Sequence, residues 1–243
     1  MNAIEIKHLR KEYKDVVAVK DLSLEVREGE IFSLLGVNGA GKTTTIKMLS
    51  ALTRPTSGDA FILGKSILTN ADEVKGLIDI SMQETAVARK LTVAENIEFY
   101  AALNGLTKEE TQKAKQTCYE TFGLKEVENK MASKLSGGWQ RKLSIALALV
   151  TRPKVLFLDE PTLGLDVLAR RELWRTIEKM KGQMTIILTT HYMEEAEALS
   201  DRIGVMAGGE LLFVGTKEEM FASSGKQSVE EAFIELVTGG KRE

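Results

Sequence analysis

The sequence contains no run of about 18 uninterrupted apolar residues, the length that a typical membrane-spanning helix requires. Its longest apolar stretches, such as 31–37 and 145–150, have the size of a strand or a core helix. A single cysteine, Cys118, excludes an internal disulfide, and the first residues lack the apolar segment of a signal peptide. These absences predict an intracellular protein that reaches a membrane only from the aqueous side.

Charge and composition exclude several further classes of protein. The chain has 33 Lys and Arg against 35 Asp and Glu, a net charge of −2, so no excess of positive charge attracts nucleic acid or anionic lipid. With 43% hydrophobic and 28% charged residues, it is neither disordered, collagen-like nor a coiled coil. Only three prolines occur and no Pro-rich or Gly/Ser-rich linker divides the 243 residues, which favours a single domain. The balanced charge predicts that this domain has no nucleic-acid partner.

Hydrophobic spacing predicts the order of the elements. Apolar and polar residues alternate over the first thirty positions, as in half-buried antiparallel strands. Between 86 and 149, Glu, Lys, Ala and Leu recur with helical spacing, which predicts a mostly helical insert. Strands alternating with helices around such an insert predict an α/β fold with an α-helical subdomain. The other expected elements are strands at 31–35, 60–63, 77–81, 155–158 and 185–190 and helices at 42–52, 170–180 and 193–199.

A phosphate-binding loop follows the strand at 31–35. The segment 36–43 matches the pattern G-x-x-x-x-G-K-[ST] in full, between an apolar strand and a helix. Glycines let the backbone wrap around phosphate oxygens, and the N–H groups at the helix start point at the anion. We expect Lys42 to reach the β- and γ-phosphates of ATP and Thr43 to offer its hydroxyl to Mg²⁺, the alternative being a plain Gly-rich turn. The predicted nucleotide-binding residues here are Gly36, Asn38, Gly39, Ala40, Gly41, Lys42, Thr43 and Thr44.

Two carboxylates end the strand at 155–158. In a doubly wound sheet, Asp159 lies at the carboxyl edge beside the phosphate loop, where it can hold Mg²⁺. Glu160 then lies next to the γ-phosphate and can orient and deprotonate the attacking water. An acidic pair after an apolar strand is common for structural reasons alone, so the phosphate loop upstream gives this pair its significance.

The segment Leu135-Ser136-Gly137-Gly138-Trp139 resembles the signature LSGGQ of the ATP-binding-cassette (ABC) family. In that family the segment opens a helix and binds the γ-phosphate held by the phosphate loop of another subunit. Ser136, Gly137 and Gly138 would therefore complete a nucleotide site on a second chain. Trp139 stands where the family usually has Gln, and a flexible turn is the alternative interpretation of the glycines.

Further positions match the same family one by one. The resemblance implies that Tyr13 stacks on adenine, that Gln83 contacts Mg²⁺ and the attacking water, and that His191 bonds the γ-phosphate and holds the catalytic Glu160. It implies that Asp166 lies in the loop that crosses to the opposite nucleotide site, although a helix-capping Asp is the alternative. Met82 and Val167 stand where the family usually has Pro. The residues 163–166 and 189–202 resemble most closely the bacterial drug- and sodium-export branch, of the daunorubicin-resistance type.

The resemblance implies an ABC nucleotide-binding domain over 1–243. We expect a P-loop NTPase core with an N-terminal antiparallel β subdomain at 1–83 and 155–220, a helical subdomain at 84–154, and a short C-terminal helix and tail at 221–243. The implied function is an ATPase that dimerises around two Mg-ATP and powers export through separate membrane permease subunits, at the cytoplasmic face of the membrane. An importer ATPase, a soluble ABC ATPase of translation or DNA repair, and a non-hydrolysing binding module are the alternatives.

Overall fold

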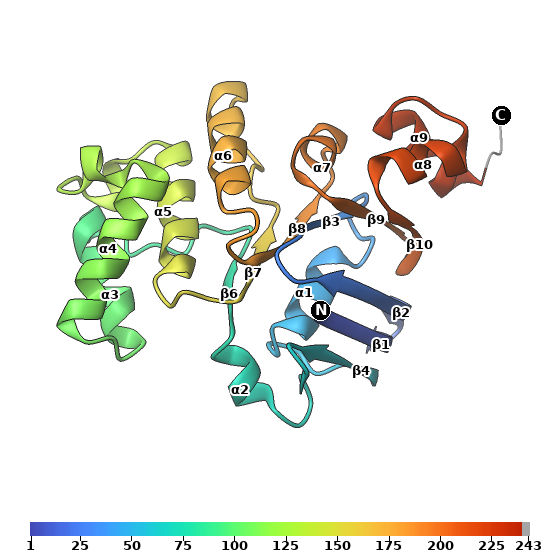
Figure 1. Ribbon diagram of the computed structural model, residues 1–243, viewed down its shortest axis with the longest axis horizontal. Helices are drawn as coiled ribbons and strands as arrows, with labels where there is room; N and C mark the ends of the chain where they lie inside the picture. The colour runs from blue at the N-terminus through green and yellow to red at the C-terminus, as the bar shows by residue number, and fades with distance from the viewer. Residues whose placement is uncertain (240–243) are drawn as a thin grey trace.

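A largely parallel sheet forms the centre of the molecule. The computed structural model describes residues 1–239, and within them the strands of this sheet follow the order β10-β9-β3-β8-β7-β6 (Figure 1). Every residue of three of the inner strands, β3, β8 and β7, is buried, which explains their largely apolar sequence. Only β10 runs antiparallel to its neighbour. The strands are β3 (Ile31–Leu35), β6 (Ile78–Ser81), β7 (Val155–Asp159), β8 (Thr185–Thr190), β9 (Arg202–Ala207) and β10 (Glu210–Gly215).

The N-terminal segment forms an antiparallel sheet, as its alternating sequence predicts. The strands β1 (Asn2–Tyr13) and β2 (Val16–Arg27) pair with each other, and β4 (Ser57–Ile62) and β5 (Lys65–Ser66) extend the sheet. Its apolar side shares one core with α1 (Lys42–Leu49) and with the central sheet, through residues such as Ile6, Ile46 and Phe157. The helix α1 therefore lies between the two sheets, which fixes where the loop before it can point.

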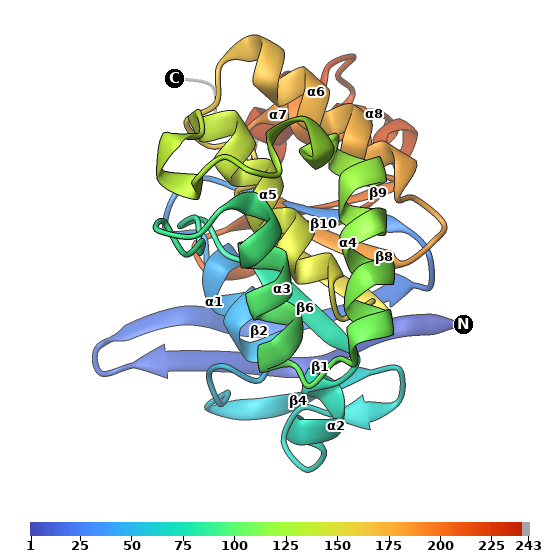
Figure 2. The ribbon, with the colours of Figure 1, turned by 90° about the vertical axis from the view of Figure 1, so that its left-hand side faces the viewer.

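The helical insert stands at one side of the central sheet (Figures 1 and 2). It contains α3 (Val93–Leu103), α4 (Lys108–Phe122) and α5 (Gly137–Leu149), with short 3₁₀ turns at Leu124–Val127 and Ala132–Lys134. Capping boxes at Thr92 and Thr107 begin α3 and α4, because each threonine is followed three residues later by a glutamate. The insert shares its core with the sheet through α5, whose residues 141–149 are all buried.

The remaining helices lie around the two sheets. They are α2 (Ala71–Lys75), α6 (Val167–Lys179), α7 (Met193–Leu199), α8 (Lys217–Ser224) and α9 (Val229–Thr238). The last two pack with β9 and α7 in a separate core that includes Met220 and Phe233. The boundary expected at residue 221 lies inside α8, and the end of the predicted tail, 240–243, lies outside the described residues. Among residues 1–239, no helix is both long and apolar enough to cross a membrane.

Candidate active site

The phosphate loop lies between β3 and α1, as the sequence predicts. Gly39 and Gly41 have φ angles of 80° and 104°, in a region that residues with a Cβ rarely adopt. Gly41 precedes α1, and no side chain caps the helix N-terminus. The first N–H groups of α1 are therefore free to bind an anion, and the helix dipole favours negative charge there.

A cavity of about 510 Å³ opens at this loop. It brings together the loop residues with Gln83, Glu160 and His191, which come from three different strand ends. Four of the lining residues are not predicted by any nucleotide-binding motif, namely Leu163 and the β2 residues Val16, Val17 and Ala18. The β2 residues reach the loop only because the tertiary fold carries the β1–β2 hairpin there. The full lining is Val16, Val17, Ala18, Asn38, Gly39, Ala40, Gly41, Lys42, Thr43, Thr44, Gln83, Glu160, Leu163 and His191.

Lys42 is held inside the cavity by its own loop. Its ammonium donates to the carbonyl oxygen of Gly36 at 2.7 Å and to that of Val37 at 3.2 Å. It also lies 3.3 Å from Oε1 of Glu160, and its side chain is only 5% exposed. This buried cation at the start of α1 adds to the positive potential that a phosphate group would meet.

Asp159 lies at the carboxyl end of β7 with an unsatisfied oxygen. Its Oδ1 accepts hydrogen bonds from Thr43 at 3.1 Å and from Thr189 at 2.6 Å. Its Oδ2 is buried and has no hydrogen-bond partner among the described residues. A carboxylate oxygen buried without a partner is costly, and carboxylate and hydroxyl oxygens are the ligands that Mg²⁺ prefers. Asp159 and Thr43 therefore fit a magnesium ion, while the third expected ligand, Gln83, lines the same cavity with an exposed side chain.

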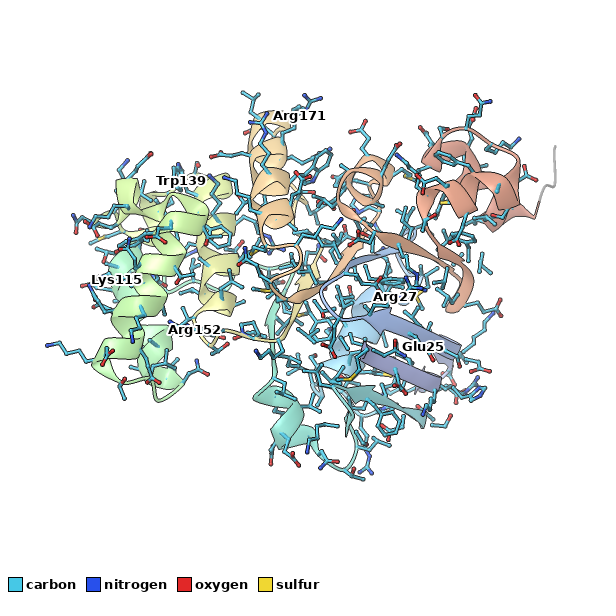
Figure 3. All side chains as sticks on the ribbon, in the orientation of Figure 1. Glu25, Arg27, Lys115, Trp139, Arg152 and Arg171 are labelled. Carbon is cyan, nitrogen blue, oxygen red and sulfur yellow. The ribbon has the colours of Figure 1, made fainter. Side chains whose placement is uncertain are left out.

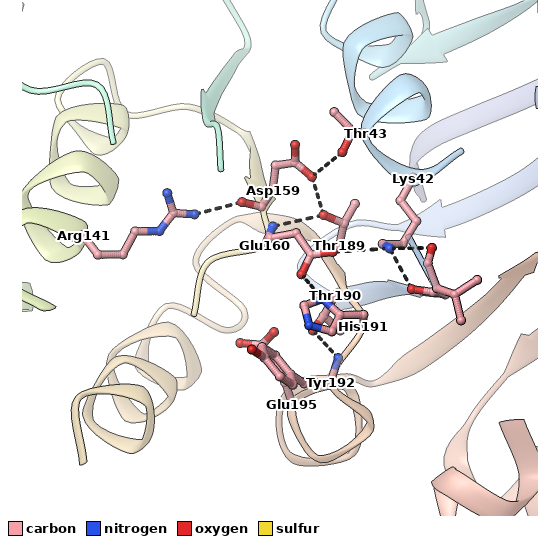
Figure 4. Close-up of polar contacts among 12 residues, drawn as sticks. Lys42, Thr43, Arg141, Asp159, Glu160, Thr189, Thr190, His191, Tyr192 and Glu195 are labelled. Carbon is pink, nitrogen blue, oxygen red and sulfur yellow. Dashed lines mark hydrogen bonds and ion pairs between the residues drawn. The ribbon is translucent and has the colours of Figure 1, made fainter. Parts of the chain in front are cut away.

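Glu160 lies between a lysine and a histidine (Figure 4). One carboxylate oxygen faces Lys42, and the other lies 2.7 Å from Nδ1 of His191. The backbone of Glu160 has a φ of 47°, and its N–H donates to Oγ1 of Thr189 at 3.1 Å. The carboxylate is 7% exposed, so it is shielded from bulk water and held by two neighbours at the cavity wall.

Two buried charged residues beside the cavity, Arg141 and Glu195, are not predicted by any sequence motif. The guanidinium of Arg141 donates to the backbone carbonyl of Asp159 at 2.9 Å, and burial lowers its pKa to about 10. The carboxyl group of Glu195 accepts from the indole N–H of Trp174 at 2.9 Å, and burial raises its pKa. No local pattern marks either residue, because adjacent charged residues on a helix are ordinarily exposed.

Other predicted site residues lie outside this cavity. Ser136 precedes α5 and, like Gly137 and Gly138, is absent from the cavity lining within the described chain. The half-buried side chain of Trp139 packs against the core of the helical insert (Figure 3), which accounts for a large apolar residue after the glycines.

Tyr13 lies at the end of β1, is 44% exposed and is likewise absent from the lining described above. Asp166 caps α6 by accepting hydrogen bonds from Leu168 and Ala169 at 2.9 Å, so the capping interpretation of this residue is confirmed.

Comparisons with known proteins agree with this geometry. A family model described as ABC transporter matches residues 19–163. The chain is 45% identical over 217 residues to the human (Homo sapiens) phospholipid-transporting ATPase ABCA3, covering 88% of this chain and 13% of that protein. It is 38% identical to the probable multidrug ABC transporter ATP-binding protein YbhF of Escherichia coli, covering 96% of this chain and 41% of that protein. The chain thus spans less than half the length of either relative.

A solved structure gives the same result. The dimeric post-hydrolysis state of the ATP-binding cassette MJ0796, bound to ADP and Pi, has a TM-score of 0.78 to this chain at 26% identity. The match covers 88% of this chain and 98% of that one. The expected P-loop fold with an antiparallel β subdomain and a helical insert is confirmed.

Proposed function

Since the chain belongs to the ABC transporter family of ATPases, we propose that it hydrolyses ATP at the phosphate-loop cavity to power export across a membrane. One observation supports this proposal above the others. The Glu160 carboxylate is held between the Lys42 ammonium and the His191 ring, in the cavity that the phosphate loop lines. A base, a phosphate-binding cation and a hydrogen-bonding ring are thus within reach of one γ-phosphate.

Phosphate binding uses the loop and α1. The free N–H groups at the start of α1 bind phosphate oxygens, and Lys42 exchanges its carbonyl partners for the β- and γ-phosphates. Asn38, Ala40 and Thr44 line the same wall. In our proposal Tyr13, which pairs with Val16 in the β1–β2 hairpin, stacks on adenine.

Hydrolysis requires a base for the attacking water. Glu160 accepts a proton from the water as its oxygen attacks the γ-phosphorus, and the bond between that phosphorus and the bridging oxygen of ADP breaks. His191 holds the carboxylate of Glu160 through Nδ1, which leaves its other ring nitrogen to face the γ-phosphate. The products are ADP and inorganic phosphate.

Magnesium is the expected cofactor of this site. Thr43 and Asp159 would hold the ion, together with Gln83 from the adjacent loop. When bound, Mg²⁺ neutralises charge on the β- and γ-phosphate oxygens. The buried Oδ2 of Asp159, which has no hydrogen-bond partner among residues 1–239, would gain one in the ion.

We propose that two ATP-binding chains close head to tail around two ATP molecules. The location of residues 136–138 outside the phosphate-loop cavity supports this arrangement, because these residues then remain free to bind the γ-phosphate on the second chain. The second chain is another copy or a paralogue. The related cassette described above is dimeric.

We also propose that separate permease subunits hold this chain at the cytoplasmic face of the membrane. The relative named as a probable multidrug transporter supports export, and the residues 163–166 and 189–202 favour the daunorubicin-resistance type. Copurification with an integral-membrane subunit and efflux from cells support this part of the proposal. Association with ribosomes or DNA alone, or ATP-dependent uptake, would contradict it.

The ATPase is tested by Lys42→Ala. Because Lys42 is the cation assigned to the β- and γ-phosphates, its loss should lower the ATPase rate by about 100-fold or more, measured by phosphate release. Lys47→Ala is the matched control, since Lys47 lies on the same helix and is absent from the cavity lining described above. An unchanged rate in Lys42→Ala would show that the phosphate-loop assignment is wrong.

A further inference from the structure

Arg141 is a buried cation whose partners are backbone carbonyl groups. It is only 4% exposed and lies on α5, which begins just after Ser136. Its guanidinium donates from Nε to the carbonyl of Pro161 at 2.8 Å. From Nη2 it donates to the carbonyl of Asp159 at 2.9 Å (Figure 4). From Nη1 it donates to the carbonyls of Met82 at 2.5 Å and Gln83 at 3.4 Å.

The first two acceptors lie on either side of Glu160. That residue has a φ of 47°, a left-handed conformation that a residue with a side chain adopts only when its surroundings impose it. One planar guanidinium therefore holds the residues before and after the strained position. The direction of the Glu160 side chain toward Lys42 and His191 depends on that backbone conformation.

The other two acceptors lie in the loop after β6 that carries Gln83 to the cavity. Arg141 thus contacts two walls of the cavity from behind without lining it. Because α5 begins at the signature segment and is buried over residues 141–149, a movement of that segment would reach both walls through one side chain.

We propose that Arg141 is a positioning residue that couples the signature helix to Glu160 and Gln83. This inference rests on the proposed ATPase function. Arg141 does not line the cavity, and it acts by holding the Glu160 carboxylate and the Gln83 loop in fixed positions relative to α5. The planar guanidinium is essential, because its N–H groups point in fixed directions toward all four carbonyl oxygens. The single ammonium group of a lysine cannot reach all of them.

The test compares Arg141→Lys and Arg141→Met with Lys142→Met. Lys142 is the next residue on α5, is 6% exposed, and pairs with Glu172 of α6 at 2.6 Å. ATP turnover, the dissociation constant of a fluorescent ATP analogue, and the melting temperature are measured for each variant. The control should lose thermal stability while its kcat stays within about twofold of the wild-type value.

We expect both Arg141 variants to lose about 10- to 100-fold in kcat while the dissociation constant changes by less than about threefold, because the phosphate loop itself is intact. Charge retention in Arg141→Lys should not rescue kcat. If Arg141 had a purely structural role, its substitution would lower the melting temperature, but it would not lower kcat while leaving the dissociation constant of the ATP analogue nearly unchanged.

Three results would overturn the inference. They are a wild-type kcat in Arg141→Lys, an equal loss of kcat in Lys142→Met, and a failure of Arg141→Lys to fold, which would assign the residue to stability alone. If Arg141→Met does not fold, Arg141→Lys decides. Failure of the proposed function is distinguishable, because Lys42→Ala would then be as active as the wild type.

Discussion

At the scale of single residues, Glu195 is a second carboxyl group buried near the pair formed by Glu160 and His191. It is fully buried, its Oε1 accepts from Trp174, and its Oε2 lacks a hydrogen-bond partner among residues 1–239. Burial is the main cause of its raised pKa, and the charge of Glu160 contributes. A carboxyl group in this environment favours the protonated form.

The consequence is a pH-dependent stability that Glu195→Gln should remove. Because the pKa is raised in the folded state, the stabilising contribution is complete below the unfolded pKa of about 4.3 and is lost as the pH rises through the folded value. Gln keeps the acceptor for Trp174 without the charge. The variant should therefore melt above the wild type at pH 7.5, by roughly 3–6 °C for each unit of pKa shift, and the difference should be much smaller at pH 4.5, close to the unfolded pKa.

Glu194→Gln is the control, because Glu194 lies on the same helix and is exposed. This substitution should change the melting temperature little at either pH. A lower melting temperature of Glu195→Gln at pH 7.5 would show that the ionised carboxylate stabilises the fold. Thermal melts at the two pH values, in one buffer system and at fixed ionic strength, make the comparison.

At the scale of elements, the phosphate loop is determined by contacts as well as by glycine flexibility. A Cβ added at Gly41 would lie 2.4 Å from the carbonyl oxygen of Ala18 and 2.9 Å from a methyl group of Met206. A Cβ at Gly39 would meet no atom within 4 Å. Both glycines have positive φ angles, so an alanine at either position would be strained. Only at Gly41 would the added Cβ also clash with neighbouring atoms.

This difference gives a matched pair of variants. Gly39→Ala should cost on the order of 1–2 kcal/mol of folding free energy, from the left-handed conformation alone. Gly41→Ala has the same strain and also a clash with backbone of β2, so it should cost more and displace the loop. Urea unfolding and binding of a fluorescent ATP analogue measure the two effects. Equal losses of stability would contradict the role of the Ala18 contact.

Several helices begin directly after a residue whose side chain caps the helix N-terminus. Helix α6 begins at Val167, earlier than the expected position 170, because Asp166 caps it. Helices α8 and α9 follow Thr216 and Ser228, each with a glutamate three residues later, a signal that would have placed both helices. These boundaries were predictable from the sequence, whereas the packing of α8 and α9 against β9 was not.

At the scale of the whole molecule, the geometry favours a dimer that forms with ATP. The signature residues 136–138 lie outside the cavity of their own chain, and Leu163, Val167 and Leu168 are exposed apolar residues beside the predicted crossing loop. Burying these side chains against a second chain would stabilise the closed state. In the proposed dimer, ATP would supply the remaining contacts by bridging the phosphate loop of one chain and the signature segment of the other.

Glu160→Gln tests this arrangement. The amide keeps the shape of the carboxylate but cannot accept the proton from water, so the variant should lose turnover and accumulate as an ATP-bound dimer. Gel filtration with ATP and Mg²⁺ measures the dimer, and the same variant with ADP is the control. Adding Ser136→Arg should abolish the dimer while ATP binding to the monomer persists. A Glu160→Gln chain that stays monomeric with ATP would count against the proposal.

The sequence by itself determined the fold class, the helical insert, and the cavity residues of the phosphate loop together with Gln83, Glu160 and His191. Motifs of this kind are local, because glycine conformations and strand ends depend on neighbours along the chain. The tertiary structure alone decided which charged residues are buried and which segments meet. Arg141, Glu195 and Ala18 matter through contacts with residues distant in sequence, and such contacts exist only once the sheets and helices have packed together.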